Sequence, residues 1–295
     1  MKKVINILAA ALLLFSSALF AQQESTFTLY RYHMNMVNPA YAGVDGQTVI
    51  TGSVRRQWTG INDAPSTQAV SFGTSVGKNL GLGISVVNDK VSVEKQNIVG
   101  VDFSYKVKVD AVADLYLGVK AGGSFYDVNT TGRNGAELER VPLDESTFNP
   151  NIGVGALLKS KSFFMSLSIP TLINSENSRN LNNPNRKIPV QKPHVYWSTG
   201  YDINLNKAAS LVLKPSFMLR YVNGAPVSFD FNTLLKIQQY VEFGGMYRLN
   251  KGYAGIVDFT ISKKLMVGYA YESMTSGTQL QGAGNTHEFF IKFTL

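Results

Sequence analysis

Residues 97–109, Asn-Ile-Val-Gly-Val-Asp-Phe-Ser-Tyr-Lys-Val-Lys-Val, alternate between two kinds of side chain. One set of alternate positions is large and apolar: Val99, Val101, Phe103, Tyr105, Val107 and Val109. The other set is small, polar or charged: Gly100, Asp102, Ser104, Lys106 and Lys108. Because successive side chains of a β-strand point to opposite faces, this stretch predicts a strand with one apolar and one polar face.

The same alternation recurs in about fourteen stretches, for example at 115–125, 197–203, 227–236 and 289–295. A soluble β-sandwich also alternates, so the period alone does not choose between classes. Here charged residues occur in mid-strand opposite large apolar ones, and many stretches are near the length that crosses a bilayer at a tilt. The pattern therefore predicts an all-β fold, a transmembrane antiparallel β-barrel of about 14 strands.

The connections between these stretches alternate in length. Those after even-numbered strands are short: 77–79, 110–112, 160–161 and 262–263. The long ones all follow odd-numbered strands: 129–148, 171–192 and 275–285. Outer-membrane barrels have short periplasmic turns and longer external loops. An even strand number would place both ends of the barrel chain in the periplasm.

The amino-terminal residues have the pattern of an export signal. Lys2 and Lys3 precede an apolar core at 7–15, and a cleavage region ends at Ala21. The sequence thus divides into a signal peptide (1–21), a pre-barrel segment (22–46) and a barrel (47–295). Export together with a barrel predicts the cell outer membrane as the location and its lipid as a partner.

The pre-barrel segment is too apolar to lie in water, with eight large apolar or aromatic residues between Phe27 and Tyr41. Glycines also crowd the expected lumen face: Gly81, Gly83, Gly100, Gly118, Gly122, Gly153, Gly155 and Gly200. Glycine in a strand marks either a bend or the close approach of other backbone. We therefore consider two interpretations, curvature of the strands and a plug formed by 24–46 in or across the periplasmic mouth.

Composition excludes several functions. The formal charge of the chain is +8, or +6 without Lys2 and Lys3, and its basic residues form no Lys/Arg run. This pattern argues against binding of nucleic acid and favours binding of lipid headgroups or of an acidic partner.

Residue types that build reactive sites are scarce. There is no Cys, and His33, His194 and His287 are isolated, so we expect these histidines to be satisfied polar residues. No nucleophile or zinc motif is present. We expect no catalytic site, metal or cofactor; the acids at 137–145 are more simply solvated loop residues than a weak calcium site.

Two sequence blocks resemble a known family. The first is Asn38-Pro39-Ala40-Tyr41-Ala42-Gly43. The second comprises Arg55, Gln57, Trp58 and Gly60 followed by Ala64, Pro65 and Thr67. In this order and spacing they resemble the PorP/SprF outer-membrane proteins of the type IX secretion system of Bacteroidetes. The stretch 87–91 departs from the family in lacking a glycine after its acidic residue.

The motif residues also have a physical interpretation. Asn38-Pro39 is a turn or helix-start signal, and Gly43 permits a positive φ just before the first strand. Arg55 shares the expected lumen face of its strand, whereas Val54 and Trp58 share the lipid face, with Trp58 at the outer rim. Arg55 either recognises a partner or the plug, or forms an ion pair with Asp102, Asp114 or Asp230. Asn38 to Gly43 are either architectural or partner contacts.

The resemblance implies a non-enzymatic component of the type IX system, a machinery associated with gliding motility. One family role assists export or surface attachment of adhesin-type proteins with a C-terminal sorting domain. The other links the outer membrane to the periplasmic machinery. The external loops 129–148 and 171–192 could bind a substrate. The alternative, from a different class, is a passive outer-membrane diffusion channel.

Overall fold

The computed structural model describes residues 27–61, 63–128, 145–173, 179–180, 183–187, 192–274 and 284–295. The expected signal peptide and most of the three long loops lie outside these ranges, so the signal-peptide boundary stays a prediction. Within the described ranges no helix is long and apolar enough to span a membrane.

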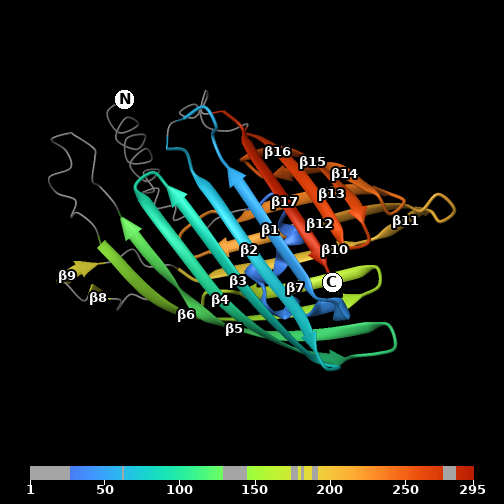
Figure 1. Ribbon diagram of the computed structural model, residues 1–295, viewed down its shortest axis with the longest axis horizontal. Helices are drawn as coiled ribbons and strands as arrows, with labels where there is room; N and C mark the ends of the chain where they lie inside the picture. The colour runs from blue at the N-terminus through green and yellow to red at the C-terminus, as the bar shows by residue number, and fades with distance from the viewer. Residues whose placement is uncertain are drawn as a thin grey trace, which may run out of the picture.

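Strands make up most of the described chain (Figure 1). They are β1 (Val49–Arg56), β2 (Ser66–Val76), β3 (Leu80–Val91), β4 (Glu94–Lys108), β5 (Ala113–Val128), β6 (Glu145–Ser160), β7 (Phe163–Ile169), β10 (His194–Tyr201), β11 (Ile203–Asn206), β12 (Leu211–Val222), β13 (Ser228–Ile237), β14 (Val241–Arg248), β15 (Gly252–Ser262), β16 (Leu265–Met274) and β17 (Thr286–Thr294). A separate short hairpin is formed by β8 (Arg179–Asn180) and β9 (Asn183–Lys187).

The large sheet closes on itself. Neighbouring strands follow chain order and pair antiparallel, β1 pairs with β17, and β10 pairs with both β7 and β12. Because β10 and β11 are consecutive parts of one strand interrupted at Asp202, the ring contains 14 strands. The predicted closed antiparallel barrel is confirmed.

The two ends of the barrel differ as the connection lengths predict. The turns after β2, β4, β6 and β15 are short and lie at the end where β1 begins and the chain terminates (Figure 1). The long connections leave the opposite end. We call these the turn end, expected to face the periplasm, and the loop end, expected to face outwards.

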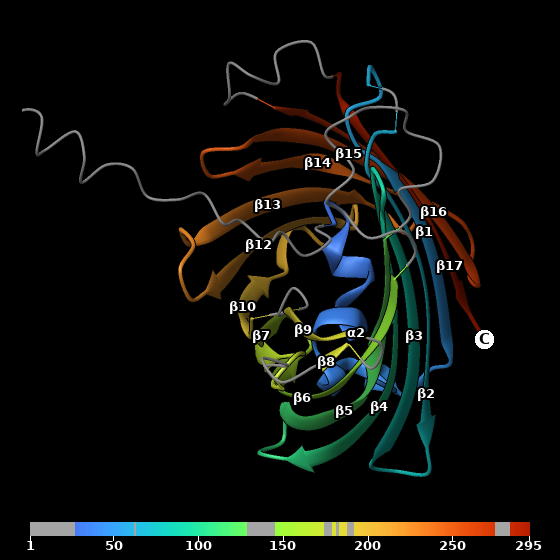
Figure 2. The ribbon, with the colours of Figure 1, turned by 90° about the vertical axis from the view of Figure 1, so that its left-hand side faces the viewer.

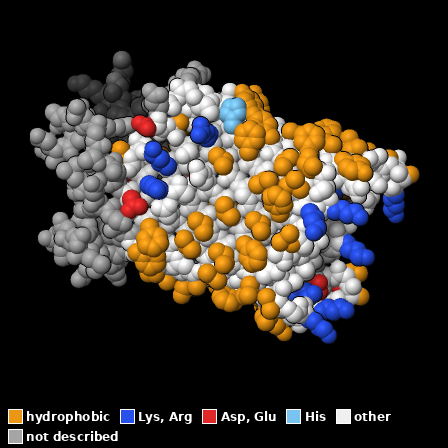
Figure 3. Space-filling model, viewed as in Figure 1, with side chains coloured by type: hydrophobic (Ala, Val, Ile, Leu, Met, Phe, Trp, Pro, Cys, Tyr) orange, Lys and Arg blue, Asp and Glu red, His pale blue; other side chains and the backbone are white. Residues whose placement is uncertain are grey.

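The two strand faces are those that the alternation predicts. On β4, Phe103 is 49% exposed and Tyr105 50%, whereas Asp102 is fully buried and Ser104 nearly so. Apolar side chains spread over the outer wall of the barrel (Figure 3). These outward residues do not form the core of the fold. They form the surface that contacts lipid in the membrane.

This assignment predicts the effect of a charge on the outer wall. Phe103→Arg should lower the free energy of membrane folding by about 2–4 kcal/mol, because a cation near the bilayer midplane is poorly solvated. Val109→Arg, beyond the turn-end limit of β4, is the control and should cost about 0–1 kcal/mol. The folded fraction of both variants is measured by heat-modifiable gel migration after refolding into lipid. Normal assembly of the Phe103→Arg variant would contradict the assignment.

The core lies inside the barrel. Residues 27–46, here called the plug, fold into four short helical turns in the lumen (Figure 2): η1 (Tyr30–Tyr32), α2 (Met34–Val37), η2 (Pro39–Tyr41) and η3 (Val44–Gly46). Buried plug residues pack on apolar lumen residues, which are Val87, Tyr196, Met218, Leu234, Met246, Ile256 and Phe290. The alternation suggests a lumen that is polar throughout. The lumen is instead partly apolar, because part of its wall packs against the plug.

The plug runs along the lumen rather than across one mouth. Thr28 and Leu29 bond to Glu288, near the loop-end start of β17. Gly43 lies against Thr74 and Gly81, beside the turn between β2 and β3. The predicted plug is present, but it enters the lumen at the level of the loop end and extends to the turn end.

Candidate functional site

The first family block, Asn38 to Gly43, forms the part of the plug nearest the turn end. The Asn38 side-chain oxygen accepts a hydrogen bond from the Ala40 N–H at 2.9 Å, and Pro39 occupies the first position of η2. Gly43 has φ +66°, a left-handed conformation that glycine adopts without strain. The helix start and the positive φ predicted from the sequence are both confirmed.

This block packs against a part of the lumen wall that is formed by glycines, which have no side chains. A Cβ atom added at Gly81 would overlap the Ala42 carbonyl oxygen. One added at Gly118 would overlap Ala40 N, and one at Gly155 the Asn38 side-chain oxygen. Plug backbone therefore packs directly on barrel backbone at Gly81 and Gly118, and the Asn38 side chain packs on the backbone of Gly155, which is the close approach that strand glycines permit.

Hydrogen bonds hold the block on that wall. The Ser104 hydroxyl donates to the Ala42 carbonyl at 2.6 Å, and the Asn38 side-chain N–H donates to the Ala156 carbonyl at 3.1 Å. Each bond satisfies a polar group that would otherwise be buried without a partner. Asn38 is fully buried, so in this conformation it contacts the barrel wall rather than an external partner.

Of the five remaining predicted lumen glycines, one lies against the plug and four lie against the barrel itself. Gly83 faces the Ala42 methyl group of the plug. Gly122 and Gly153 instead approach backbone of neighbouring barrel segments, while Gly100 and Gly200 approach barrel side chains. The plug explains four of the eight glycines, and local packing of the barrel itself explains the other four.

Arg55 lies in the lumen near the loop end, with its side chain buried between two carboxylates. Its guanidinium contacts Glu272 at 2.8 Å and Glu288 at 3.0 Å, and donates to the Thr28 hydroxyl at 2.7 Å. The two interpretations of Arg55, ion pairing and plug recognition, thus describe one cluster. The three expected partners were wrong: Asp102 pairs with Lys120, Asp230 pairs with two other arginines, and Asp114 lies near the opposite end of the barrel.

The reason for the wrong partners is topological. Barrel closure places β1 beside β17, with Arg55 directly opposite Glu288 in register. The two residues are separated by most of the chain, so alternation assigns both to the lumen but cannot show that they meet.

The Arg55 cluster continues around the wall as a row of alternating charges. Arg248 contacts Glu272 at 2.8 Å and Asp230 at 2.9 Å, and Arg220 contacts Asp230 at 2.9 Å. We call the six residues the charge belt: Arg55, Glu272, Glu288, Arg248, Asp230 and Arg220. All are buried, and buried charges persist only when paired and hydrogen-bonded.

The charge belt also binds plug backbone. The N–H groups of Thr28 and Leu29 donate to the two oxygens of Glu288 at 2.8 Å and 3.1 Å. The Thr28 hydroxyl donates to Glu272 at 2.8 Å. The first described turn of the plug is therefore fixed by the same carboxylates that pair with Arg55.

The second family block shapes the connection between β1 and β2. The Gln57 N–H donates to the carbonyl of buried Pro65, which follows half-buried Ala64, and the fully buried Thr67 donates its hydroxyl to Asp89 at 2.7 Å. Gly60 approaches Gly284, two residues before the last strand begins. In this conformation these residues organise the loop end of the barrel wall.

Trp58 differs from its expected place on the lipid face. The strand ends at Arg56, and Trp58 adopts φ +51°, which interrupts the alternation. Its indole N–H donates to the Met274 sulfur at 2.9 Å, and Met274 shares the strand face of the lumen residues Ala270 and Glu272. The indole therefore lies towards the lumen side of the rim.

Comparison with known sequences agrees with this geometry. The chain matches the sequence model described as type IX secretion system membrane protein PorP/SprF over residues 19–293. The chain belongs to this family. No curated protein sequence matches it. The matched range includes both the plug block and the β1–β2 block.

Solved structures show the same fold at low identity. The outer membrane protein Omp33 of Acinetobacter baumannii is 10% identical, with a TM-score of 0.50, 86% of this chain covered and 100% of that chain. The CymD monoaromatic hydrocarbon channel is 10% identical, with a TM-score of 0.51 and coverages of 88% and 91%. These likenesses place the PorP/SprF chain among outer-membrane β-barrels.

The described histidines do not assemble a reactive site in this PorP/SprF protein. His194 and His287 each have a hydrogen-bond partner through Nδ1. Neither ring nitrogen of His33 has one within the described residues, so the expected satisfaction was wrong for that residue. Burial lowers the pKa of His33 to about 3, which keeps its ring neutral between Phe27 and Phe290. No three His, Asp or Glu residues of the described ranges could together hold a metal ion.

Three further lumen residues, which belong to neither family block, hold the middle of the plug. The Tyr32 hydroxyl donates to Asp258 at 2.6 Å, and the Tyr32 ring stacks on Phe290 at 4.2 Å. Lys120 donates to the Asn35 carbonyl at 3.3 Å. Asp258, Phe290 and Lys120 have no motif around them, and their strand parity is the only sequence signal that they face the lumen.

Proposed function

We propose that this barrel is a non-enzymatic docking component of the type IX secretion system. It holds a protein partner at one of its two ends while its lumen stays occupied. In the first role it assists export or surface attachment of adhesin-type proteins with a C-terminal sorting domain. In the second it links the outer membrane to the periplasmic machinery.

The observation that carries this proposal is the anchoring of the plug along the whole lumen. The charge belt binds its first turn, Asp258 and Lys120 bind its middle, and Ser104 and Ala156 bind its last part. Buried apolar packing accompanies these bonds. A lumen filled in this way supports partner binding at the barrel ends and argues against passive diffusion.

Affinity purification of a tagged copy from native outer membranes, with mass spectrometry of bound proteins, tests the proposal. Recovery of a large surface protein with a sorting domain would support the first role. Recovery of periplasmic, peptidoglycan-linked components would support the second. If neither is recovered and the purified protein conducts ions steadily in planar bilayers, the channel alternative would replace the proposal.

Deleting a long loop distinguishes partner binding at the loop end from partner binding at the turn end. Removing residues 130–146, at the loop end, should leave heat-modifiable folding unchanged and abolish recovery of a surface protein. It should not affect recovery of periplasmic components, because these would bind at the turn end. Unchanged recovery of a surface partner would show that this loop is not the docking element.

A further inference from the structure

The turn end of the barrel carries a ring of cations that face inwards. Lys106 of β4 shares the strand face of the buried Asp102 and Ser104. By the same parity Lys159, Lys236 and Lys292 lie on the lumen faces of β6, β13 and β17. These strands lie on different sides of the ring, so the lysines surround the mouth.

The turns themselves add further cations. Lys78, Lys161, Lys207, Lys263 and Lys264 are exposed in the short connections. Lysine and arginine side chains gather at this end of the molecule, with few acidic ones among them (Figure 3). By contrast, the β3–β4 hairpin at the loop end places both signs side by side, in Asp89, Lys90, Glu94 and Lys95.

Among the side chains that the structure describes, the carboxylates at the mouth are fewer than these cations. The described carboxylates on the inward face here are Asp114, Asp202, Glu242 and Asp258, the last of which lies opposite Glu242 in register and accepts a hydrogen bond from Tyr32. Asp202 already approaches Arg31 at 3.8 Å, and Glu242 contacts Lys214 at 3.0 Å and Lys236 at 3.5 Å. Neither Lys106 nor Lys161 forms an ion pair with a carboxylate in the ranges that the structure describes.

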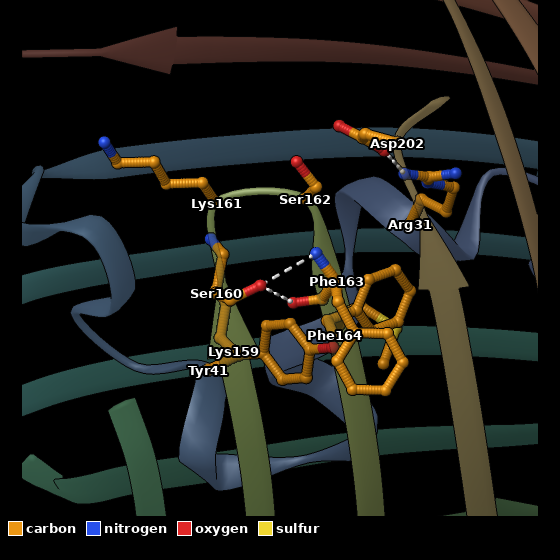
Figure 4. A pocket seen from close by; sticks show the side chains of 10 residues that line it. Arg31, Tyr41, Lys159, Ser160, Lys161, Ser162, Phe163, Phe164 and Asp202 are labelled. Carbon is orange, nitrogen blue, oxygen red and sulfur yellow. Dashed lines mark hydrogen bonds and ion pairs between the residues drawn. The ribbon is translucent and has the colours of Figure 1, made fainter. Parts of the chain in front are cut away.

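Two adjoining cavities open between the plug and this rim, each of about 190 Å³. Arg31, Tyr41 and Lys159 line both of them, and Lys292 lines the second. Figure 4 shows the first cavity, with Arg31 near Asp202 and with Lys161 on the β6–β7 turn pointing away from the aromatic rings. Each cavity is of a size for side chains of a partner, not for a folded domain.

We propose that the turn-end mouth is a binding site for a carboxylate-rich segment of a periplasmic protein. The inward direction of the lysines favours a protein segment over lipid headgroups, which would lie around the outside of the rim. The outward side chains at the same level are apolar or aromatic: Tyr105, Val107 and Tyr201 are 50%, 39% and 51% exposed. The inference names the chemistry of a periplasmic partner and so deepens the second role in the proposed function.

The test uses the purified full-length barrel and a fluorescein-labelled peptide of ten glutamates. Fluorescence anisotropy should show binding in nanodiscs of phosphatidylcholine, with an affinity that falls as salt is raised. The mouth variant Lys106→Gln/Lys159→Gln/Lys292→Gln should bind about tenfold more weakly, as expected for three partly exposed charge pairs. A ten-lysine peptide should not bind at the mouth.

The control variant Lys90→Gln/Lys95→Gln/Lys192→Gln removes the same charge at the loop end and should keep the original affinity. Both variants must show normal heat-modifiable migration. Equal weakening in both variants, or no binding by the unmodified barrel, would overturn the proposal. Neither result depends on whether the purification from native membranes recovers a partner.

Discussion

Arg55→Gln should release the first turn of the plug from the charge belt. Without the guanidinium, Glu288 has no cation within bonding distance among the described residues, and Glu272 retains only Arg248. Removing one partner of a buried ion pair costs about 3–5 kcal/mol, because the other charge is left uncompensated. Amide exchange of Thr28 and Leu29, which donate to Glu288, should accelerate more than about 100-fold.

Hydrogen–deuterium exchange of the peptide covering 27–34, followed by mass spectrometry, measures this effect. Arg56→Gln is the matched control: Arg56 is the next residue, is exposed, and forms no ion pair within the described chain. It should leave exchange unchanged. The double variant Arg55→Gln/Glu288→Gln should exchange more slowly than Arg55→Gln alone, because the unpaired carboxylate is gone. Equal exchange in Arg55→Gln and the unmodified protein would show that the belt does not hold the plug.

The double variant Gly81→Ala/Gly118→Ala should displace the family block from the wall. Each added methyl group overlaps plug backbone, at the Ala42 carbonyl and at Ala40 N respectively. Backbone cannot move aside as a flexible side chain can, and overpacking of this kind costs about 1–3 kcal/mol per site. With both sites changed, we expect the plug to leave this part of the lumen.

Ion conductance in planar bilayers measures the displacement, since an emptied lumen of this barrel should carry current. Gly255→Ala is the control, because a Cβ atom added there meets nothing within 4 Å. The control should resemble the unmodified protein in conductance and in thermal unfolding. A double variant that stays as closed as the control would contradict the direct packing of the block on the strand glycines.

Much of the fold follows from local features of the chain. The period of two assigned Phe103 to the outer wall and Asp102 to the lumen, and the parity of connection lengths separated the two ends. The helix start at Asn38 and the positive φ at Gly43 depend on the chemistry of two residues, which is why they could be predicted. The wrong predictions also have specific physical reasons. The prediction that Trp58 lies on the lipid face is wrong because β1 ends two residues earlier, so the alternation no longer applies to Trp58.

The sequence by itself determined the barrel, its strand faces, the grouping of short turns at one end and long loops at the other, and the family blocks. These depend on properties that repeat at short range, such as side-chain alternation and turn chemistry. Only the tertiary structure decided that Arg55 meets Glu288 and Glu272, that Phe290 stacks on Tyr32, and that the plug extends from the charge belt to the turn end. Those contacts join residues more than 200 positions apart, and they exist only because closure of the ring places the first strand beside the last.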